Sequence, residues 1–196
     1  MWTEWSTAQV ALVISGLSFC LALASFVWNV WSKFLFPKPK LRIWVDLRYA
    51  QKSGAHSASL RENGTFAGDL DPSSMVYPAI ALCVTNFGPG SVTVTSACGR
   101  LPRFHPRRKE GHGILVAYNS YPDDLSANSI SSGGLPKKLD IGETFELYFP
   151  VNPTFMATKE VSAIGVRDTL SRLSWVSRQN MNRLRKQFGA HQKLQS

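Results

Sequence analysis

The chain begins with one long apolar run, and apolar and polar residues alternate in short stretches after it. Residues 8–31 contain no charged side chain, and a helix of that length would be roughly 36 Å long, enough to cross the hydrocarbon core of a bilayer. Tryptophans lie just before this run and at its far end, as in the aromatic belts of membrane helices. The pattern predicts a transmembrane helix.

A cleavable signal peptide is the alternative interpretation of the same run. Ala22-Leu23-Ala24 resembles a small-residue cleavage site, but signal peptides begin with positive charge. The only charged residue before this run is Glu4. The sequence therefore favours an anchor that stays attached.

Lysine and arginine lie on one side of the run. None precedes it, whereas Lys33, Lys38 and Lys40 follow it closely. Because the cytoplasmic flanks of membrane helices carry an excess of these residues, we expect a single-pass protein of the inner (plasma) membrane, with its N-terminus outside and its C-terminal domain in the cytoplasm. In that compartment Cys83 and Cys98 would be reduced thiols, packed in strands.

After residue 40, apolar residues recur at every second position, as in half-buried strands. Residues 41–49 follow this pattern. Residues 77–85 and 91–97 are rich in β-forming residues, and the turn formers NFGPG stand between them. We expect these two segments to form a hairpin in which Gly88 adopts a positive φ.

More short strands are expected downstream, and the segments between them lack periodicity. The further expected strands are 114–118, 143–149, 159–167 and 172–177. Residues 51–74 are expected to be a long mobile loop or an irregular insertion, and 100–113 an exposed basic loop. Because no long helical pattern intervenes, the fold class is predicted to be mainly β, with an antiparallel β-sandwich of about seven strands after the transmembrane helix.

A short amphipathic helix is expected at the end of the chain. Ser177 is a suitable N-cap, and Met181, Leu184 and Phe188 recur at helical spacing. Residues 189–196 are expected to fray. The predicted organisation is an anchor with flanks at 1–36, a Pro/Lys linker at 37–40, a β-sandwich at 41–177 and a basic helix with its tail at 178–196.

The stretch CVTNFGPGSVTV at 83–94 resembles the V-x-N-x-G corner of immunoglobulin-like bacterial and archaeal domains that serve as adhesion or surface repeats, where the Asn and Gly shape the corner between two strands. The wider layout, with VRDTLSR at 166–172, is similar to small bacterial and prophage membrane-anchored proteins of unknown function. This resemblance implies an immunoglobulin-like β-sandwich and brings no catalytic residues to transfer. The expected cytoplasmic side departs from the surface adhesins.

Candidate chemistry is sparse. Cys83 and Cys98 form no CxxC pair, and His105 and His112 flank a cationic segment at a spacing that matches no helical metal site. No nucleophile elbow and no phosphate-binding loop occur. Asp168 is interpreted as a turn former whose side chain accepts from the backbone two residues on. We therefore expect no metal, no cofactor and no enzyme activity.

Basic residues are the feature that points to a partner. The chain has 22 Lys and Arg against 13 Asp and Glu, a formal net charge of +9. Two groups stand out, one in the expected loop after residue 100 and one on the C-terminal helix. The candidate anionic-surface residues are Arg103, Arg107, Arg108, Lys109, Arg178, Arg183, Arg185 and Lys186.

Functions of different classes follow. The first is a non-enzymatic, membrane-anchored interaction module that binds a protein partner or forms a homo-oligomer. The alternative is a module that binds anionic lipid headgroups or nucleic acid through the basic residues. Lipid is favoured over nucleic acid because the domain is tethered beside a membrane, where each near-surface cation contributes about 1 kcal/mol. An enzyme with a site assembled from the loops is a third hypothesis.

Overall fold

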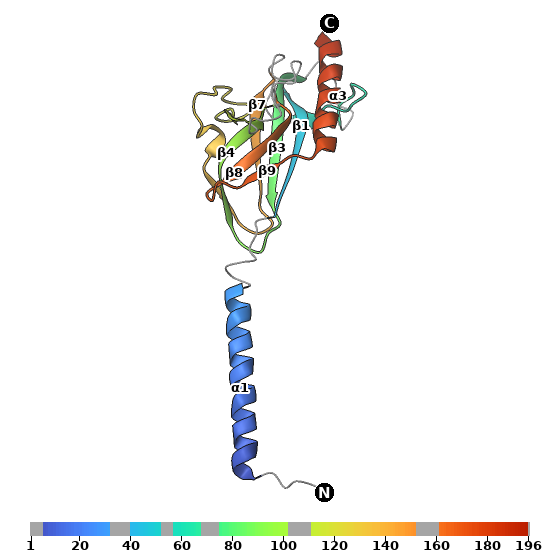
Figure 1. The fold of residues 1–196 in the computed structure, drawn as a ribbon. Coiled ribbons are helices and arrows are strands. Elements are labelled where there is room, and N and C mark those ends of the chain that lie inside the picture. Colours follow the sequence, from blue (N-terminus) through green and yellow to red (C-terminus); the bar gives the residue numbers. More distant parts are fainter. Residues whose placement is uncertain are drawn as a thin grey trace. The chain divides into compact units, whose positions relative to one another are not determined.

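The computed structural model describes residues 6–31, 40–51, 57–67, 75–101, 111–151 and 161–195. The chain divides into two compact units, Met1–Lys38 and Pro39–Ser196. Figure 1 shows the elements of each unit. We describe the units separately.

The first unit contains one helix, α1 (Thr7–Val30). Ser6 caps its start in a capping box, because its hydroxyl accepts from the Gln9 backbone while the Gln9 side chain accepts from the Ser6 backbone. None of the described residues of α1 is buried. The helix is long and apolar enough to cross a membrane, as the sequence predicted.

The described part of the second unit contains nine strands. They are β1 (Leu41–Gln51), β2 (Ser57–Ser59), β3 (Met75–Asn86), β4 (Val92–Arg100), β5 (His112–Leu115), β6 (Lys137–Leu139), β7 (Thr144–Pro150), β8 (Ala163–Asp168) and β9 (Leu173–Trp175). A short 3-10 turn, η3 (Ser132–Gly134), precedes β6. A C-terminal helix, α3 (Arg178–Gln195), follows β9.

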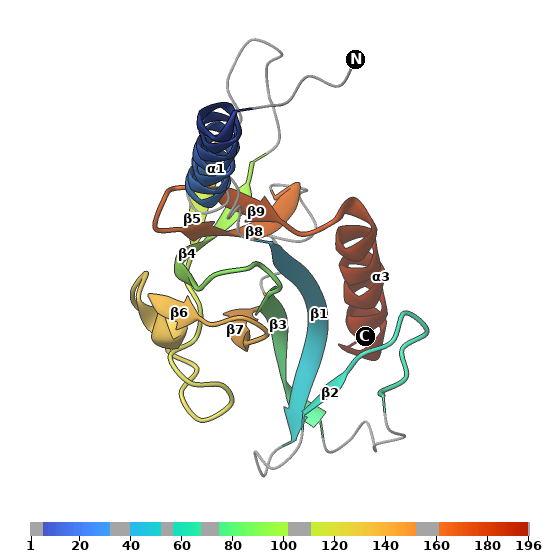
Figure 2. The ribbon, with the colours of Figure 1, turned by 90° about the horizontal axis from the view of Figure 1, so that it is seen from below.

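All strands pair in antiparallel fashion and form two sheets. One sheet has the order β2-β1-β3-β7, and the other has the order β5-β4-β8-β9, with β6 paired to β4 beside β5. Figure 2 shows the two sheets from the end of the domain where β1 begins. The expectation of a mainly β, antiparallel domain is confirmed.

The core lies between the two sheets. Alternation along β1 puts Ile43, Val45 and Leu47 inside, with exposed fractions of 7%, 3% and 0%, as the pattern at 41–49 predicted. Leu82 of β3, in the same sheet, and Val166 of β8, in the other sheet, belong to one continuous cluster with them. Burial of these alternating side chains stabilises both sheets together.

The expected hairpin between 77–85 and 91–97 is wrong. Both segments are strands, but β3 pairs with β1 and β7 while β4 pairs with β5, β6 and β8. The turn between them therefore carries the chain from one sheet to the other. Gly88 is not among the described glycines with positive φ, which are Gly64, Gly133, Gly134 and Gly142.

Asn86 holds this corner. Its side chain is fully buried, and its Nδ2 donates to the carbonyl oxygens of Gly90 (2.8 Å) and Leu139 (3.1 Å). Its Oδ1 accepts from the Gly88 backbone at 2.9 Å. A buried amide with its donors and acceptor satisfied fixes the corner without any need for an unusual glycine conformation.

Of the two interpretations of 51–74, the mobile loop is wrong for the described part. It contains β2, which pairs with the end of β1, and Ala58, Leu60 and Phe66 are 5%, 0% and 4% exposed. The Phe66 ring packs edge-on against Tyr49 with centroids 5.0 Å apart. Isolated apolar residues thus join the core although the segment shows no long periodicity.

Helix α3 starts where it was expected and ends later. The Ser177 hydroxyl accepts from the Asn180 backbone at 3.3 Å, and Met181, Leu184 and Phe188 are buried. The frayed tail predicted from residue 189 is wrong, because the helix continues to Gln195. His191, which is 4% exposed and hydrogen-bonded to the Tyr49 hydroxyl, holds this last part against β1.

The Gln187 side chain of α3 also joins the helix to the edge of β1. Gln187 is fully buried; its Oε1 accepts from the Leu47 backbone at 3.2 Å, and its Nε2 donates to the Leu60 carbonyl at 2.6 Å and to Asp46 at 2.5 Å. The amide thus pairs backbone groups just beyond the short strand β2. In this way α3 covers a strand edge that would otherwise be open.

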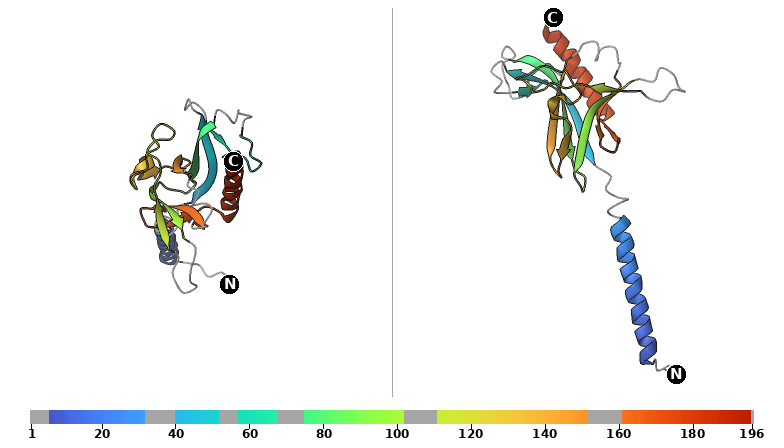
Figure 3. Two further views of the ribbon diagram at one scale, coloured as in Figure 1. Left: turned by 90° about the horizontal axis from the view of Figure 1, so that it is seen from above. Right: turned by 90° about the vertical axis from the view of Figure 1, so that its left-hand side faces the viewer.

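The two long sides of the domain therefore differ. Figure 2 and the left panel of Figure 3 show α3 beside β1, and they show the yellow segment around residues 120–135 on the opposite side. We name the α3 side the closed side and the side between β5 and β7 the groove side.

The expected turn at Asp168 is confirmed. Its Oδ1 accepts from the backbone N–H groups of Leu170 (2.9 Å) and Arg172 (2.7 Å). These bonds connect β8 to β9 tightly and give Asp168 a structural role.

Candidate functional site

The groove side contains an apolar pocket of about 180 Å³. The lining residues come from both sheets and from the segment after β5; they are Ile80, Ile114, Leu115, Val116, Phe149, Pro150 and Ile164. Ile80 and Ile164 are each only 1% exposed, whereas Ile114 is 50% exposed. The pocket thus reaches from a surface isoleucine to side chains of the core.

Pairing of β5 explains where this pocket forms. Leu115 lies opposite Ala97, and Ile114 lies opposite Cys98. Among the described strands β5 pairs with β4 alone, so its other edge borders the pocket. After β5 the chain crosses to the other sheet, where the Tyr118 backbone N–H donates to the Tyr148 carbonyl at 2.7 Å.

We name residues 116–136, which run from β5 to β6, the crossing segment. Gly133 lets the crossing segment cover part of the groove side. Its φ is +74°, and a Cβ there would lie 2.8 Å from Leu147 and 3.1 Å from Ala117. A side chain at this position would force the segment away from β7. The part near Phe149 and Pro150 stays open and forms the pocket.

The size of the pocket restricts what it can hold. Pockets for drug-sized ligands usually measure about 300–1,000 Å³, whereas an apolar cavity of about 150 Å³ holds a benzene-sized group. At about 180 Å³, the volume suits one aromatic or branched aliphatic side chain.

A polar cluster lies on the outer face of the sheet that contains β3, away from the core. Arg48 of β1 pairs with Glu146 of β7 at 2.8 Å and contacts Cys83 of β3 at 3.6 Å. Tyr148 donates to Glu146 at 2.5 Å, and Cys83 donates to the same carboxylate at 3.1 Å. Tyr121 stacks on Tyr148 with ring centroids 4.4 Å apart.

The surroundings of this cluster keep the Cys83 thiol and the Tyr148 hydroxyl protonated near neutral pH. Burial, together with the hydrogen bond to Glu146, raises the pKa of the Cys83 thiol to about 12. Burial alone would raise the pKa of Glu146, but hydrogen bonds from Tyr148, Cys83 and Arg48 outweigh it and lower that pKa. Burial raises the pKa of Tyr148 to about 12. A protonated thiol beside a fixed carboxylate is a poor nucleophile.

The cysteines and possible metal ligands were also considered in the sequence. Cys83 and Cys98 are buried free thiols in β3 and β4, as expected. In the part of the chain that the structure describes, His, Cys, Asp and Glu form no group of three or more that could hold a metal ion.

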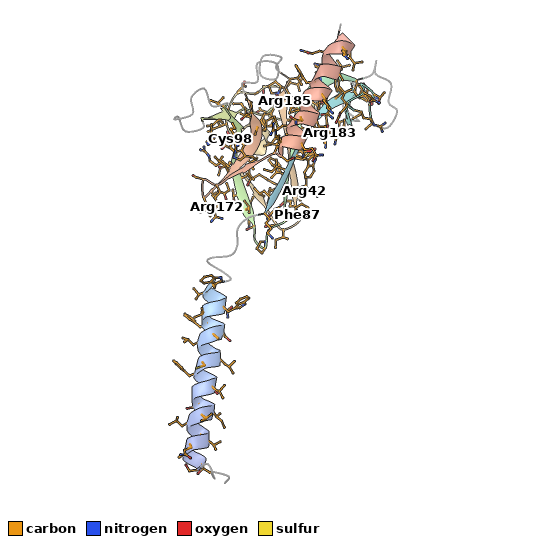
Figure 4. The ribbon with its side chains drawn as sticks, turned by 45° about the vertical axis from the view of Figure 1, so that its right-hand side comes forward. Arg42, Phe87, Cys98, Arg172, Arg183 and Arg185 are labelled. Carbon is orange, nitrogen blue, oxygen red and sulfur yellow. The ribbon has the colours of Figure 1, made fainter. Side chains whose placement is uncertain are left out.

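The structure describes half of the predicted basic residues. Four of them, Arg103, Arg107, Arg108 and Lys109, lie outside the described residues. The other four, Arg178, Arg183, Arg185 and Lys186, lie on α3, and Figure 4 labels Arg183 and Arg185 there.

The α3 cations do not act as one free group. The Lys186 ammonium pairs with Glu62 at 2.9 Å. The Arg185 guanidinium donates to Asn182 (3.3 Å) and to the Val161 carbonyl (3.5 Å). Binding of lipid or nucleic acid through this helix stays a prediction.

Sequence reasoning missed the pocket and the polar cluster. The alternation of 143–149 already put Glu146 and Tyr148 on one face, which was a usable signal for the cluster. The pocket had no such signal, because its residues come from segments whose pairing the sequence does not specify.

No protein-family model, no curated protein and no solved structure matches this chain.

Proposed function

We propose that this protein is a membrane-anchored, non-enzymatic interaction module that binds an extended segment of a partner protein along β5, with one apolar side chain of the partner in the groove-side pocket. The domain is immunoglobulin-like in kind and faces the cytoplasm of a bacterial cell, with α1 as the single span of the inner membrane. The one-sided lysines after α1 support this orientation.

The open pocket beside an edge strand carries the proposal. An edge strand offers backbone donors and acceptors to an added strand, and a neighbouring pocket selects its side chains. Ile114 stands at the rim of the pocket with half of its surface exposed, and Ile80 and Ile164 lie deeper. The pocket is too small for most cofactors.

The polar groups support a binding role over catalysis. The Cys83 thiol, one of two buried thiols in the described strands, has a pKa raised to about 12. It lies on the outer face of its sheet with Glu146 and Arg48 rather than at the pocket. Charge pairing of this kind stabilises a sheet face, and the described residues that line the pocket carry no acidic or basic side chain.

Site-specific photocrosslinking of the full chain in membranes tests the proposal. A photoreactive residue at Val116, in the pocket lining, should form a discrete adduct with one protein, whereas the same residue at Ile130 should not. Ile130 is a matched control because it is 57% exposed and is not part of the lining. Adding Ile114→Arg should abolish the Val116 adduct.

Three outcomes would count against the proposal. Equal adducts at both positions would indicate a non-specific contact, and an adduct that survives Ile114→Arg would place the partner elsewhere. An adduct between two copies of this chain would make the domain a self-association module.

A further inference from the structure

Three exposed apolar side chains lie at the end of the domain where β1 begins. Phe87, Ile141 and Leu170 are 56%, 64% and 66% exposed. Each one lies in a different turn, between β3 and β4, between β6 and β7, and between β8 and β9. Single exposed hydrophobic residues are common, but three of them on turns at one end of a domain form a group of the kind that marks an interaction surface.

Backbone hydrogen bonds hold these turns together. The Gly142 N–H donates to the Asn86 carbonyl at 2.7 Å, and the Thr169 N–H donates to the Thr93 carbonyl at 3.1 Å. The first bond joins the β6–β7 turn to the corner after β3, and the second joins the β8–β9 turn to the beginning of β4. The three tips are therefore fixed at one end of the domain by both sheets.

Exposed cations lie at the same end. Lys40 precedes β1, and its carbonyl accepts from the Phe87 backbone at 2.8 Å. Arg42 and Arg172 are exposed, and Figure 4 labels them with Phe87. We name the tips Phe87, Ile141 and Leu170, with the cations Lys40, Arg42 and Arg172, the tethered end.

The acidic groups at this end have local partners. Glu143 pairs with Lys137 at 3.5 Å, and Asp140 pairs with Lys138 at 3.8 Å. The Asp168 carboxylate accepts from two backbone N–H groups of its turn. Because Lys137 and Lys138 pair with two of these three acids, Lys40, Arg42 and Arg172 leave an excess of positive charge at this end.

The short segment between α1 and β1 indicates what binds to this surface. Residues 32–40 separate the described helix end at Trp31 from Leu41, and nine residues span at most about 30 Å. With α1 in a bilayer, as proposed above, lipid is present at high effective concentration beside the tethered end, while a soluble partner must be recruited from bulk. Apolar tips ringed by cations suit the boundary between acyl chains and anionic headgroups.

We propose that the tethered end docks on the anionic lipid surface, with Phe87, Ile141 and Leu170 in the interface and Lys40, Arg42 and Arg172 at the headgroup phosphates. This surface is separate from the groove-side pocket and from the cations of α3. It would fix the orientation of the domain on the membrane, independently of whether the pocket binds a partner.

Depth-dependent fluorescence quenching tests this docking on the full chain. A probe on Thr169→Cys sits beside Leu170, and a control probe on Gln192→Cys sits on exposed α3; both use a Cys20→Ala background, because Cys83 and Cys98 are buried. The chain is reconstituted in vesicles of equal phosphatidylcholine and phosphatidylglycerol with spin-labelled lipid. Quenching should be strong at position 169 and weak at position 192.

Two sets of variants identify the groups responsible. The triple change Phe87→Ser, Ile141→Ser and Leu170→Ser should reduce quenching at 169 to the level at 192. Val76→Ser, Ile130→Ser and Leu194→Ser, which alter exposed apolar residues elsewhere, should leave it unchanged. Replacing Lys40, Arg42 and Arg172 with Gln, or using phosphatidylcholine alone, should also reduce quenching. Unchanged thermal unfolding of each variant shows that the fold is intact.

Several results would overturn the proposal. Equal quenching at 169 and 192 in the parent would show that the tethered end stays in water. Quenching that survives the three serines, or that is the same on phosphatidylcholine alone, would exclude these tips or anionic lipid as the cause. Oxidative dimers through Thr169→Cys without quenching would show that a second copy covers this end.

Discussion

On the closed side and on the groove side of the domain, the edges of the sheets are covered differently. On the closed side, α3 covers the β1 edge, and the Gln187 amide pairs with the backbone of Leu47 and Leu60. On the groove side, the crossing segment covers only part of the gap, and a pocket of about 180 Å³ is left beside β5. One side is thus closed by a buried polar network, whereas the other leaves an apolar pocket open.

The largest expected effect comes from removing the amide on the closed side. Gln187→Ala would leave a buried N–H at Leu47 and a buried carbonyl at Leu60 without partners, so it should lower the free energy of unfolding by about 2–4 kcal/mol. Denaturant unfolding of the full chain in detergent measures this loss. The matched change Gln192→Ala, at an exposed position of the same helix, should be almost neutral; an equal loss there would contradict the role of Gln187.

A smaller loss is expected on the groove side. Gly133→Ala combines a positive φ of 74° with a contact of 2.8 Å to Leu147, which should cost about 1–3 kcal/mol. Gly113→Ala is the control, because a Cβ there meets nothing within 4 Å. If both variants unfold at the same denaturant concentration as the parent, the crossing segment does not pack as described.

The stability of the fold should also depend on pH, because burial lowers the pKa of His191 on the closed side. A group with a lowered pKa stabilises the fold in its neutral form, so that stability is present above the unfolded value of about 6.5 and is lost as pH falls below it. The lowered pKa of Glu146 acts only in a more acidic range, below its usual value of 4.5. Unfolding at pH 7.5 and pH 5.5 should show a decrease that His191→Phe abolishes; a decrease that persists in this variant would point to another group.

The smallest effect on stability is expected at the rim of the pocket. Ile114→Ser alters a half-exposed side chain, and surface changes of this kind usually stay within about 0.5 kcal/mol. The same variant should weaken the photocrosslink at Val116, which separates binding from folding. A large loss of stability would show that Ile114 belongs to the core.

Local patterns in the sequence predicted the helices and strands better than the pairing between strands. The alternation at 41–49 identified the buried face of β1, and the stripe of Met181, Leu184 and Phe188 identified the buried face of α3. The corner at 86–90 was located correctly but was interpreted as a hairpin. Alternation reports that a strand has one buried face and does not report which strand lies beside it.

Buried polar residues were the other failure. Gln187 and His191 are buried in a helix whose tail was expected to fray, because polar residues are usually exposed and only tertiary partners reveal the exception. The pocket was missed for a related reason. It is made by Ile80, Phe149 and Ile164 from three strands, and no single segment carries its signature.

The attachment of the linker to β1 has a mechanical consequence. Strand β1 pairs with β3 from Leu41↔Asn86 to Gln51↔Met75, and the linker enters at the first of these pairs. A pull applied at this end and directed along the strand would load the whole ladder in shear, so that many hydrogen bonds would break together rather than one after another. Resistance of this kind is governed by the unfolding rate. Strand β1 is therefore the element through which such a pull would enter the domain.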